Sequence, residues 1–161
     1  MAIRCAAKAL LVRDGQILIN RCVSSTTNEV YYDLPGGGQH PYETMEEAVI
    51  REVAEETGYT ARVLRFAAVV EEIQDSTELR EKYPDYCHRI HHIFLVEPVD
   101  DTAALPSEMD FQQQESVWVS LSEADSLPFF PTQLRGRISE LVQSSSPVYL
   151  GSEHIGVPFC F

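Results

Sequence analysis

The sequence predicts a mixed domain of the α/β or α+β class. Its 161 residues are 44% apolar and 23% charged, which is ordinary for a globular chain long enough to bury one core. Short segments with strand-like apolar runs or alternation outnumber the segments with helical spacing. We therefore expect one domain, residues 1–161, in which helices cover the faces of a mixed sheet. Residues 145–161 form a C-terminal extension whose packing the sequence leaves open.

The first third of the chain predicts three strands. The first is apolar and rich in small residues, with Arg4 and Lys8 interspersed, which is typical of a largely buried strand. Asp14-Gly15 is a hairpin signal, so the alternating second segment should pair antiparallel with the first. These strands are expected over residues 3–12, 16–21 and 30–34.

The stretch from residue 34 to 59, LPGGGQHPYETMEEAVIREVAEETGY, predicts a glycine turn followed by a helix. The turn is formed by the glycines at 36–38. Thr44 is a suitable N-cap, and Glu47 three residues later completes a capping box. Gly58 is a natural C-terminal stop, because glycine readily adopts the left-handed conformation that ends many helices.

One face of this helix changes from apolar to acidic. At about 100° per residue, its first turns present an apolar stripe, Met45, Ala48 and Val49. The same stripe then reaches Glu52 and Glu56, with Glu55 at its edge and Arg51 on the opposite face. Carboxylates that face the protein body repel one another and lose hydration. Clustered oxygen ligands suit a hard cation such as Mg²⁺ or Mn²⁺, whereas the alternative is a solvated acidic face.

The chain after residue 60 predicts strands, an acidic loop and two helices. The strands are expected over residues 61–73, 86–96 and 115–121. The loop covers residues 98–110. A short helix should begin at Ser122, with Ser122 as its N-cap and Asp125 at position N3, and residues 132–143 predict an amphipathic helix. Its inward-facing residues are Leu134, Ile138, Leu141 and Val142. The apolar tail at 148–161 is either an extra strand or a contact between two copies of the chain.

The spacing of the charged residues in the helical stretch resembles the Nudix box. The matching positions are Gly37, five residues, Glu43, seven residues, then Arg51-Glu52-Val53-x-Glu55-Glu56-x-Gly58-Tyr59. At average residue usage, a chance match in this chain is on the order of one in a million or less. The chain departs from the family in three places, since Tyr59 is aromatic where an aliphatic is usual, and His40 and Tyr42 replace Glu and Gly.

This resemblance implies a fold, a reaction and a set of residue roles. Nudix proteins form an α/β/α sandwich with a mixed sheet, in which the box is a loop-helix-loop motif. They hydrolyse a diphosphate linkage, and the resemblance leaves nucleoside triphosphates and ADP-ribose-like derivatives open as substrates. A nucleotide-binding or regulatory module without turnover is the alternative function.

The resemblance also assigns roles to single residues. The catalytic metal ligands are Glu52, Glu55 and Glu56 with the backbone carbonyl of Gly37, and the metal is Mg²⁺ or Mn²⁺. Glu52 also serves as the base that activates water, or that role moves outside the box to Glu115 or Glu97. The remaining pair, Glu43 and Arg51, forms an ion pair that braces the loop against the helix.

The charge of the chain limits its partners. Twelve Lys and Arg against 25 Asp and Glu give a formal charge of −13, which argues against a nucleic-acid backbone or an anionic membrane as the partner. A small nucleotide would also be repelled, and a bound cation would offset that repulsion locally. The sequence shows neither a leader pattern nor a membrane-length apolar run, so a cytoplasmic protein is expected.

The cysteines and histidines suggest no second metal site. The four cysteines, at 5, 22, 87 and 160, are widely spaced and are expected to be free thiols in a reducing compartment. His91 and His92 are neighbours on an expected strand and should point to opposite faces, which disfavours a zinc site with Cys87 and His88. Arg89 on the same strand is either a surface arginine or a contact to a substrate phosphate.

Overall fold

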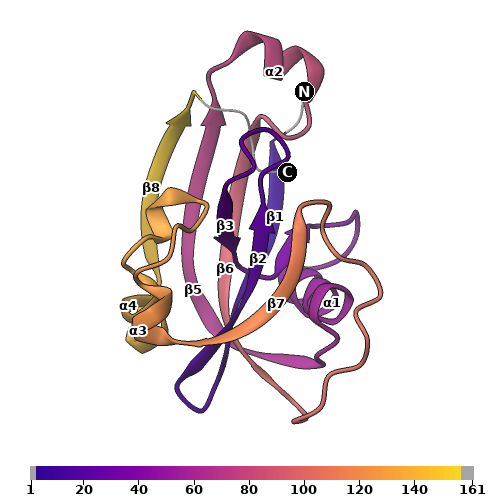
Figure 1. The fold of residues 1–161 in the computed structure, drawn as a ribbon, viewed down its shortest axis with the longest axis vertical. Coiled ribbons are helices and arrows are strands. Elements are labelled where there is room, and N and C mark those ends of the chain that lie inside the picture. Colours follow the sequence, from indigo (N-terminus) through magenta and orange to yellow (C-terminus); the bar gives the residue numbers. More distant parts are fainter. Residues whose placement is uncertain (1–2, 157–161) are drawn as a thin grey trace.

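A computed structural model of the chain describes residues 3–156, so Cys160 and the end of the predicted tail lie outside it. The described residues form one mixed sheet of eight strands (Figure 1). The strands are β1 Arg4–Arg13, β2 Gln16–Val23, β3 Val30–Asp33, β4 Gly36–Gly38, β5 Ala61–Gln74, β6 His88–Pro98, β7 Gln113–Ser120 and β8 Val148–Ile155. This arrangement confirms the predicted mixed fold.

The strand order is β3-β2-β1-β6-β5-β8, and two further strands pair outside this row, β4 with β1 and β7 with β2. β1 and β2 pair antiparallel through the turn at Asp14 and Gly15, both of which have positive φ. β5 is long and carries two register shifts against β6. β8 pairs parallel with β5 and forms an edge of the sheet (Figure 1). The described part of the predicted tail is therefore an extra strand.

The three glycines predicted as a turn form a strand instead. Gly36–Gly38 pairs antiparallel with Ala6–Lys8 on β1. A Cβ on Gly36 would lie only 2.1 Å from the carbonyl oxygen of Ala7, and Gly36 has φ of 136°. The absence of side chains therefore permits the close pairing that turns this loop into β4.

The helix α1, Met45–Thr57, has the predicted ends. The side chain of Thr44 accepts from the Glu47 amide, and the Glu47 side chain accepts from the Thr44 amide, so the capping box is complete. Gly58 ends the helix in the left-handed conformation. The apolar side of α1 packs on one face of the sheet, where Ala48, Val49 and Val53 are fully buried.

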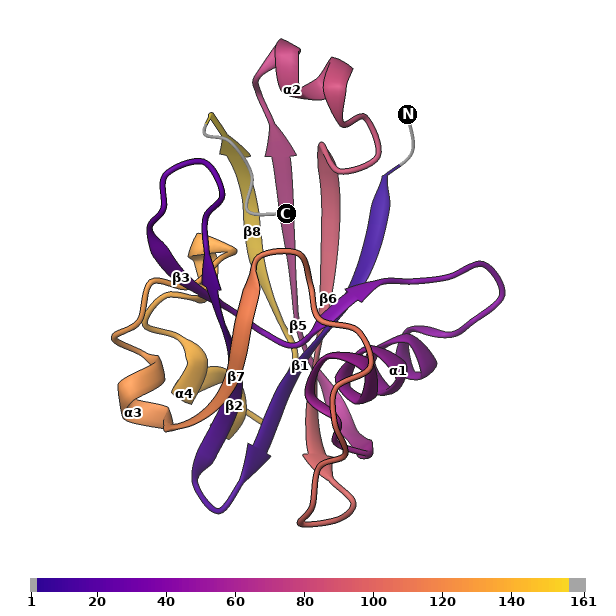
Figure 2. The ribbon, with the colours of Figure 1, turned by 45° about the vertical axis from the view of Figure 1, so that its right-hand side comes forward.

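The opposite face of the sheet is covered by short C-terminal helices (Figure 2). They are α3 Leu121–Ala124, the 3₁₀ turn η1 Thr132–Leu134 and α4 Ile138–Gln143. Two local predictions were wrong. The cap of α3 is Ser120 rather than Ser122. Residues 132–143 are not one helix, because Gly136 between η1 and α4 has φ of 70° and interrupts it.

The remaining helix, α2 Thr77–Lys82, joins β5 to β6 at one end of the sheet (Figure 1). Its N-cap is Ser76, whose side chain accepts from the Leu79 amide. Among residues 3–156, no helix is long and apolar enough to cross a membrane.

Two glycines with the same backbone conformation allow a matched test of packing at the end of α1. Gly15 and Gly58 have φ of 76° and 75°, but a Cβ on Gly58 would lie 1.9 Å from the Ala104 carbonyl oxygen, whereas one on Gly15 meets nothing. We expect Gly15→Ala to lower the free energy of unfolding by about 1–2 kcal/mol, the cost of the left-handed conformation. Gly58→Ala should cost at least about 2 kcal/mol more.

Urea unfolding of the two variants against the wild type measures both losses. Equal losses at the two positions would show that the 104 segment moves aside freely and does not fix the end of α1.

Candidate active site

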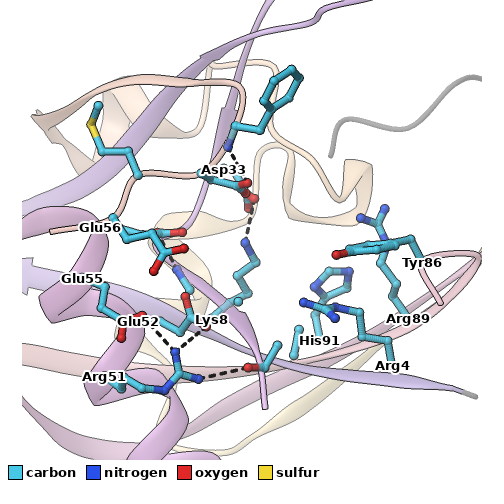
Figure 3. Close-up of a pocket in the computed structure, with 18 of the residues that line it drawn as sticks. Arg4, Lys8, Asp33, Arg51, Glu52, Glu55, Glu56, Tyr86, Arg89 and His91 are labelled. Atoms are coloured by element: carbon cyan, nitrogen blue, oxygen red, sulfur yellow. Dashed lines mark hydrogen bonds and ion pairs between the residues drawn. The ribbon is translucent and has the colours of Figure 1, made fainter. Parts of the chain in front are cut away.

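A cavity of about 800 Å³ opens beside β4, between the end of α1, the first residues of β1 and β6, and the loop at 99–112. Its two ends differ in charge (Figure 3). The acidic end carries three carboxylates of α1, those of Glu52, Glu55 and Glu56. The other end is lined by Arg4, Tyr86, Arg89 and His91.

The carboxylate of Glu56 is buried at the acidic end, with only 5% of the residue exposed. Its Oε2 accepts from Asn20 Nδ2 at 2.8 Å and from the Gly36 amide at 2.9 Å. Burial raises the pKa of Glu56 to about 8, although the charge of Lys8 and the Gly36 hydrogen bond act in the opposite direction. Glu56 therefore holds a proton near neutral pH when no cation is present.

Lys8 lies at the centre of the cavity wall, and its positive charge favours the ionised form of this buried acid (Figure 3). Its Nζ forms an ion pair with Asp33 Oδ2 at 2.7 Å and donates to the Leu34 carbonyl at 3.2 Å. Burial alone would lower the pKa of Lys8, but the charges of Asp33 and Glu56 raise it above its ordinary value. Lys8 was not among the site residues predicted from the sequence, although Arg4 and Lys8 are four positions apart and therefore on the same face of an otherwise apolar strand.

A polar network behind Glu56 fixes Asn20 in place. Asn20 Oδ1 accepts from Ser116 Oγ at 2.7 Å and from Gln113 Nε2 at 3.2 Å. Gln113 Nε2 is also within 3.3 Å of the Glu56 carbonyl oxygen. These contacts orient the Asn20 amide so that its Nδ2 donates to Glu56, and they connect β2 and β7 to α1.

Arg51 joins the glycine strand to the acidic residues of the helix. Its Nε and Nη2 donate to the two oxygens of Glu43 at 3.1 and 2.8 Å, which is the predicted ion pair in bidentate form. Nη2 also donates to the Gly38 carbonyl at 3.0 Å. The hydrogen bond from Arg51 lowers the pKa of Glu43 to about 2.

The predicted position of Arg51 was wrong, because the side chain does not stay on the opposite face of α1. Its Nη1 reaches Glu52 at 2.8 Å and Glu55 at 3.0 Å. The helical wheel places only the Cβ atom, and the long arginine side chain then bends around the helix toward the negative charges.

The sequence and the fold can be compared with those of known proteins. The model of the NUDIX domain family matches residues 3–141. The chain belongs to the NUDIX family. This match confirms the Nudix resemblance and, with it, the enzyme class of a Nudix hydrolase. A comparison with curated proteins found no match.

Solved Nudix structures agree with this fold. The MutT protein from Methanosarcina mazei is 27% identical, with a TM-score of 0.62 over 86% of this chain and 92% of that chain. The MutT protein from Bacillus halodurans has a TM-score of 0.67 at 18% identity, over 96% and 91% of the two chains. An ADP-ribose pyrophosphatase from Streptococcus suis has a TM-score of 0.61 at 16% identity, over 92% and 99%. The last two show the fold alone.

The Nudix box of this chain has the chemistry to hold a divalent cation. A Cβ on Gly37 would lie 2.7 Å from the carboxylate carbon and both oxygens of Glu52, so the glycine lets this carboxylate lie directly against the backbone. Carboxylate and carbonyl oxygens are the ligands that Mg²⁺ and Mn²⁺ prefer. The described residues contain no group of three His, Cys, Asp or Glu side chains arranged to hold a metal. In this structure Arg51 contacts Glu52 and Glu55, and Asn20 contacts Glu56.

The two carboxylates predicted as a base outside the Nudix box are not among the cavity-lining residues. Glu115 is an exposed residue of β7, and Glu97 is engaged in an ion pair on β6. Glu108 and Asp110, in the loop after β6, line the cavity instead. The amide of Glu108 donates to the Glu55 carbonyl at 3.0 Å, so this loop is anchored on α1. The sequence indicated only that the loop is acidic.

The three departures from the family pattern can be located in the structure. Tyr59 packs edge-on against Trp118, with ring centroids 5.7 Å apart, and its hydroxyl accepts from the indole nitrogen at 3.2 Å. Tyr42 has positive φ and is fully exposed, where family members often have glycine. His40 lines the cavity, and its amide donates to Glu43 at 2.6 Å.

Arg89 is not an ordinary surface arginine, which was one of the two alternatives predicted for it. Only 15% of its side chain is exposed, and its Nη2 forms an ion pair with Glu72 at 2.8 Å. His91 also contacts Glu72, at 2.9 Å, and is buried. Burial lowers the pKa of His91, although the contact with Glu72 acts in the opposite direction, and so favours the neutral imidazole. His92 packs on the other side of the strand, beside Phe66.

The raised pKa of Glu56 predicts how stability depends on pH without metal. Because the folded-state pKa of about 8 exceeds the ordinary 4.5, the stability contributed by the bound proton is fully present below pH 4.5 and is lost as pH rises through 8. In Glu56→Gln the side chain still has an oxygen that accepts from Asn20 and Gly36. Because glutamine does not ionise, the variant does not lose stability as pH rises through 8. The variant should therefore gain stability relative to the wild type between pH 5 and 9, by a few kcal/mol at about 1.4 kcal/mol per pKa unit.

The measurement is urea unfolding at several pH values with a chelator present. A stability difference between the two proteins that stays constant with pH would show that Glu56 ionises normally in the folded state.

Proposed function

We propose that this Nudix hydrolase cleaves the diphosphate linkage of a nucleoside diphosphate derivative or a related nucleotide, with Mg²⁺ or Mn²⁺ as cofactor. The observation that supports this proposal most directly is the acidic end of the cavity. Three carboxylates of the Nudix box and the Gly37 backbone border one volume that is large enough for a nucleotide. Nucleoside diphosphate derivatives such as ADP-ribose, the compound named for one protein of the same fold, are the first option, and nucleoside triphosphates are the second.

The residues of the acidic end have distinct roles in this proposal. Glu52, Glu55 and Glu56 with the Gly37 carbonyl would hold the cation. When bound, it neutralises phosphate charge and lowers the pKa of a coordinated water. Arg51 holds the β4 backbone and the side chains of Glu52 and Glu55 in register. Lys8 offsets the charge of Glu56 once that residue has lost its proton.

The proton of the attacking water requires an acceptor. Glu52 lies against the backbone of β4 and can serve as this base. Asp110 and Glu108 face the same cavity from the loop, and they replace Glu115 and Glu97 as the candidates outside the box. No covalent nucleophile is required, because diphosphate hydrolysis depends on positioning, charge neutralisation and an activated water.

The first test is a panel of nucleotide diphosphate derivatives and nucleoside triphosphates with Mg²⁺. We expect release of a nucleoside monophosphate or of phosphate from at least one class. Glu52→Gln should lower turnover at least about 100-fold by removing a charged oxygen ligand. Glu97→Gln and Glu115→Gln remove the same charge away from the cavity and should retain near wild-type turnover.

The outcome against the proposal is equally clear. Binding of nucleotides without turnover of any panel member, at any metal concentration, would identify a Nudix-fold binding module instead of an enzyme.

A second test uses the competition between protons and metal for Glu56. Because its pKa is about 8 without metal and a cation favours the ionised form, metal binding must release that proton. Raising the Mg²⁺ concentration should therefore shift the acidic limb of the rate profile to lower pH. Mn²⁺, which binds such ligands more tightly, should shift it further at equal concentration.

Initial rates against pH at several subsaturating metal concentrations measure this shift. A limb that does not move would mean that the titrating group is not a metal ligand, and Asp110 or Glu108 would then be the better candidate.

A further inference from the structure

The end of the cavity opposite the carboxylates is built around two arginines. Arg4 and Arg89 are register partners on the adjacent parallel strands β1 and β6, so their side chains leave the same face of the sheet about 5 Å apart. Both line the cavity, and Figure 3 shows them on the far side of Lys8 from Glu52, Glu55 and Glu56. Like charges placed side by side on neighbouring strands repel each other unless an anion compensates them.

Only one of these two charges is compensated within the described chain. Glu72, the register partner of Arg89 on β5, forms the ion pair with Arg89. Arg4 stacks on the ring of Tyr86, with its guanidinium carbon 4.7 Å from the ring centroid. Among residues 3–156 the guanidinium of Arg4 has neither a hydrogen-bond partner nor an ion pair. The chain has 25 acidic and 12 basic residues, yet this cavity-facing arginine pairs with none of the described carboxylates.

A second side chain at this end has one polar atom without a hydrogen-bond partner in the described residues. His91 is 4% exposed and lines the cavity. Its Nε2 contacts Glu72, whereas its Nδ1 is buried without a hydrogen-bond partner in the described residues. A buried polar atom without a partner lowers stability, which is consistent with a site whose polar groups are completed by a ligand.

The strand β4 sets the separation between the two ends of the cavity. A Cβ on Gly37 would meet the carboxylate of Glu52 at 2.7 Å, and a Cβ on Gly38 would meet the guanidinium of Arg4 at 2.4 Å. Because the Cα atoms of consecutive residues are about 3.8 Å apart, the Glu52 carboxylate and the Arg4 guanidinium lie within roughly 12 Å of each other. One small molecule can therefore contact both ends.

We propose that the substrate carries, besides the diphosphate that is cleaved, a second anionic group of phosphate or carboxylate chemistry, which Arg4 and Arg89 bind. This inference rests on the proposed function, because it assigns the arginine end to the same substrate. The planar guanidinium donates two parallel hydrogen bonds to either group. Tyr86 holds Arg4 by stacking on its face, which leaves the edge of the guanidinium, where the N–H donors lie, to meet the anion.

The arginine end also gives specificity to a protein that repels anions in general. The formal charge of −13 disfavours any phosphate compound at long range. A substrate with a second anion gains a charge-assisted contact at Arg4, while one with a neutral group there leaves Arg4 without its partner. We expect the resulting preference to be about 10-fold or more in the dissociation constant.

The test uses pairs of diphosphate compounds that differ by one anionic group. Coenzyme A and dephospho-coenzyme A, or NADP and NAD, differ by a phosphate, and UDP-glucuronate and UDP-glucose differ by a carboxylate. Dissociation constants are measured by calorimetry with the full chain and a chelator, so that turnover does not contribute. We expect tighter binding of the more anionic member in at least one pair.

Three variants connect that preference to Arg4. Arg4→Gln should abolish it, and Arg4→Lys should retain only part of it, because an ammonium keeps the charge but not the paired donors. Arg62→Gln is the charge-matched control, since Arg62 is an exposed arginine of β5 outside the cavity, and the preference should persist in it.

The results separate this inference from the proposed function. Suppose that the protein hydrolyses panel compounds but binds neither member of any pair more tightly, or that the preference survives Arg4→Gln. Either result would overturn the inference and leave the proposed function intact. A preference that depends on Arg4 in a protein without Mg²⁺-dependent turnover would support the arginine site and refute the hydrolase.

Discussion

The pairing of three consecutive glycines with β1 is the constraint on which the site depends. At Gly36 a side chain would collide with the β1 backbone, at Gly37 with the Glu52 carboxylate and at Gly38 with the Arg4 guanidinium. The same strand therefore pairs closely with β1, lets a carboxylate of α1 lie against its backbone, and lies beside the guanidinium of an arginine on β1. The two ends of the cavity are held in a fixed relation because one short backbone segment contacts both.

The acidic end is arranged for binding at the expense of stability. Glu56 is buried with a raised pKa, and the lysine that offsets its charge is itself buried and requires Asp33 as a partner. Replacing buried charges of this kind by apolar groups is often neutral or stabilising, so core formation does not explain them. Under the proposed function the arrangement is understandable, because a cation held by Glu52, Glu55 and Glu56 would compensate their charges and favour the ionised form of Glu56.

The parts of the structure that the sequence predicted correctly are those that local interactions determine. The capping box of α1, the left-handed Gly58 and the Asp14-Gly15 hairpin each depend on residues that are adjacent in the chain. Gly36–Gly38 was misjudged, because its strand exists only through pairing with residues about 30 positions earlier. Local signals also fail when two compete, as at 132–143, where the apolar periodicity was correct but Gly136 interrupts the helix.

The carboxylates of the loop show why the list of site residues could not be completed from sequence. Glu115 and Glu97 were the base candidates that the sequence suggested outside the box, and composition gave no reason to prefer an acidic residue of the loop between β6 and β7. Hydrogen bonds at the end of α1 determine which loop residues lie at the cavity. The Glu55 carbonyl accepts from the amides of Ser107 and Glu108, and the Gly58 carbonyl accepts from the amide of Ala104. The last carbonyls of a helix lack intrahelical partners, and here they bind the loop. The helix that carries the Nudix carboxylates thus also anchors the loop whose Glu108 and Asp110 line the cavity, which connects the two proposed base candidates outside the box to the box itself.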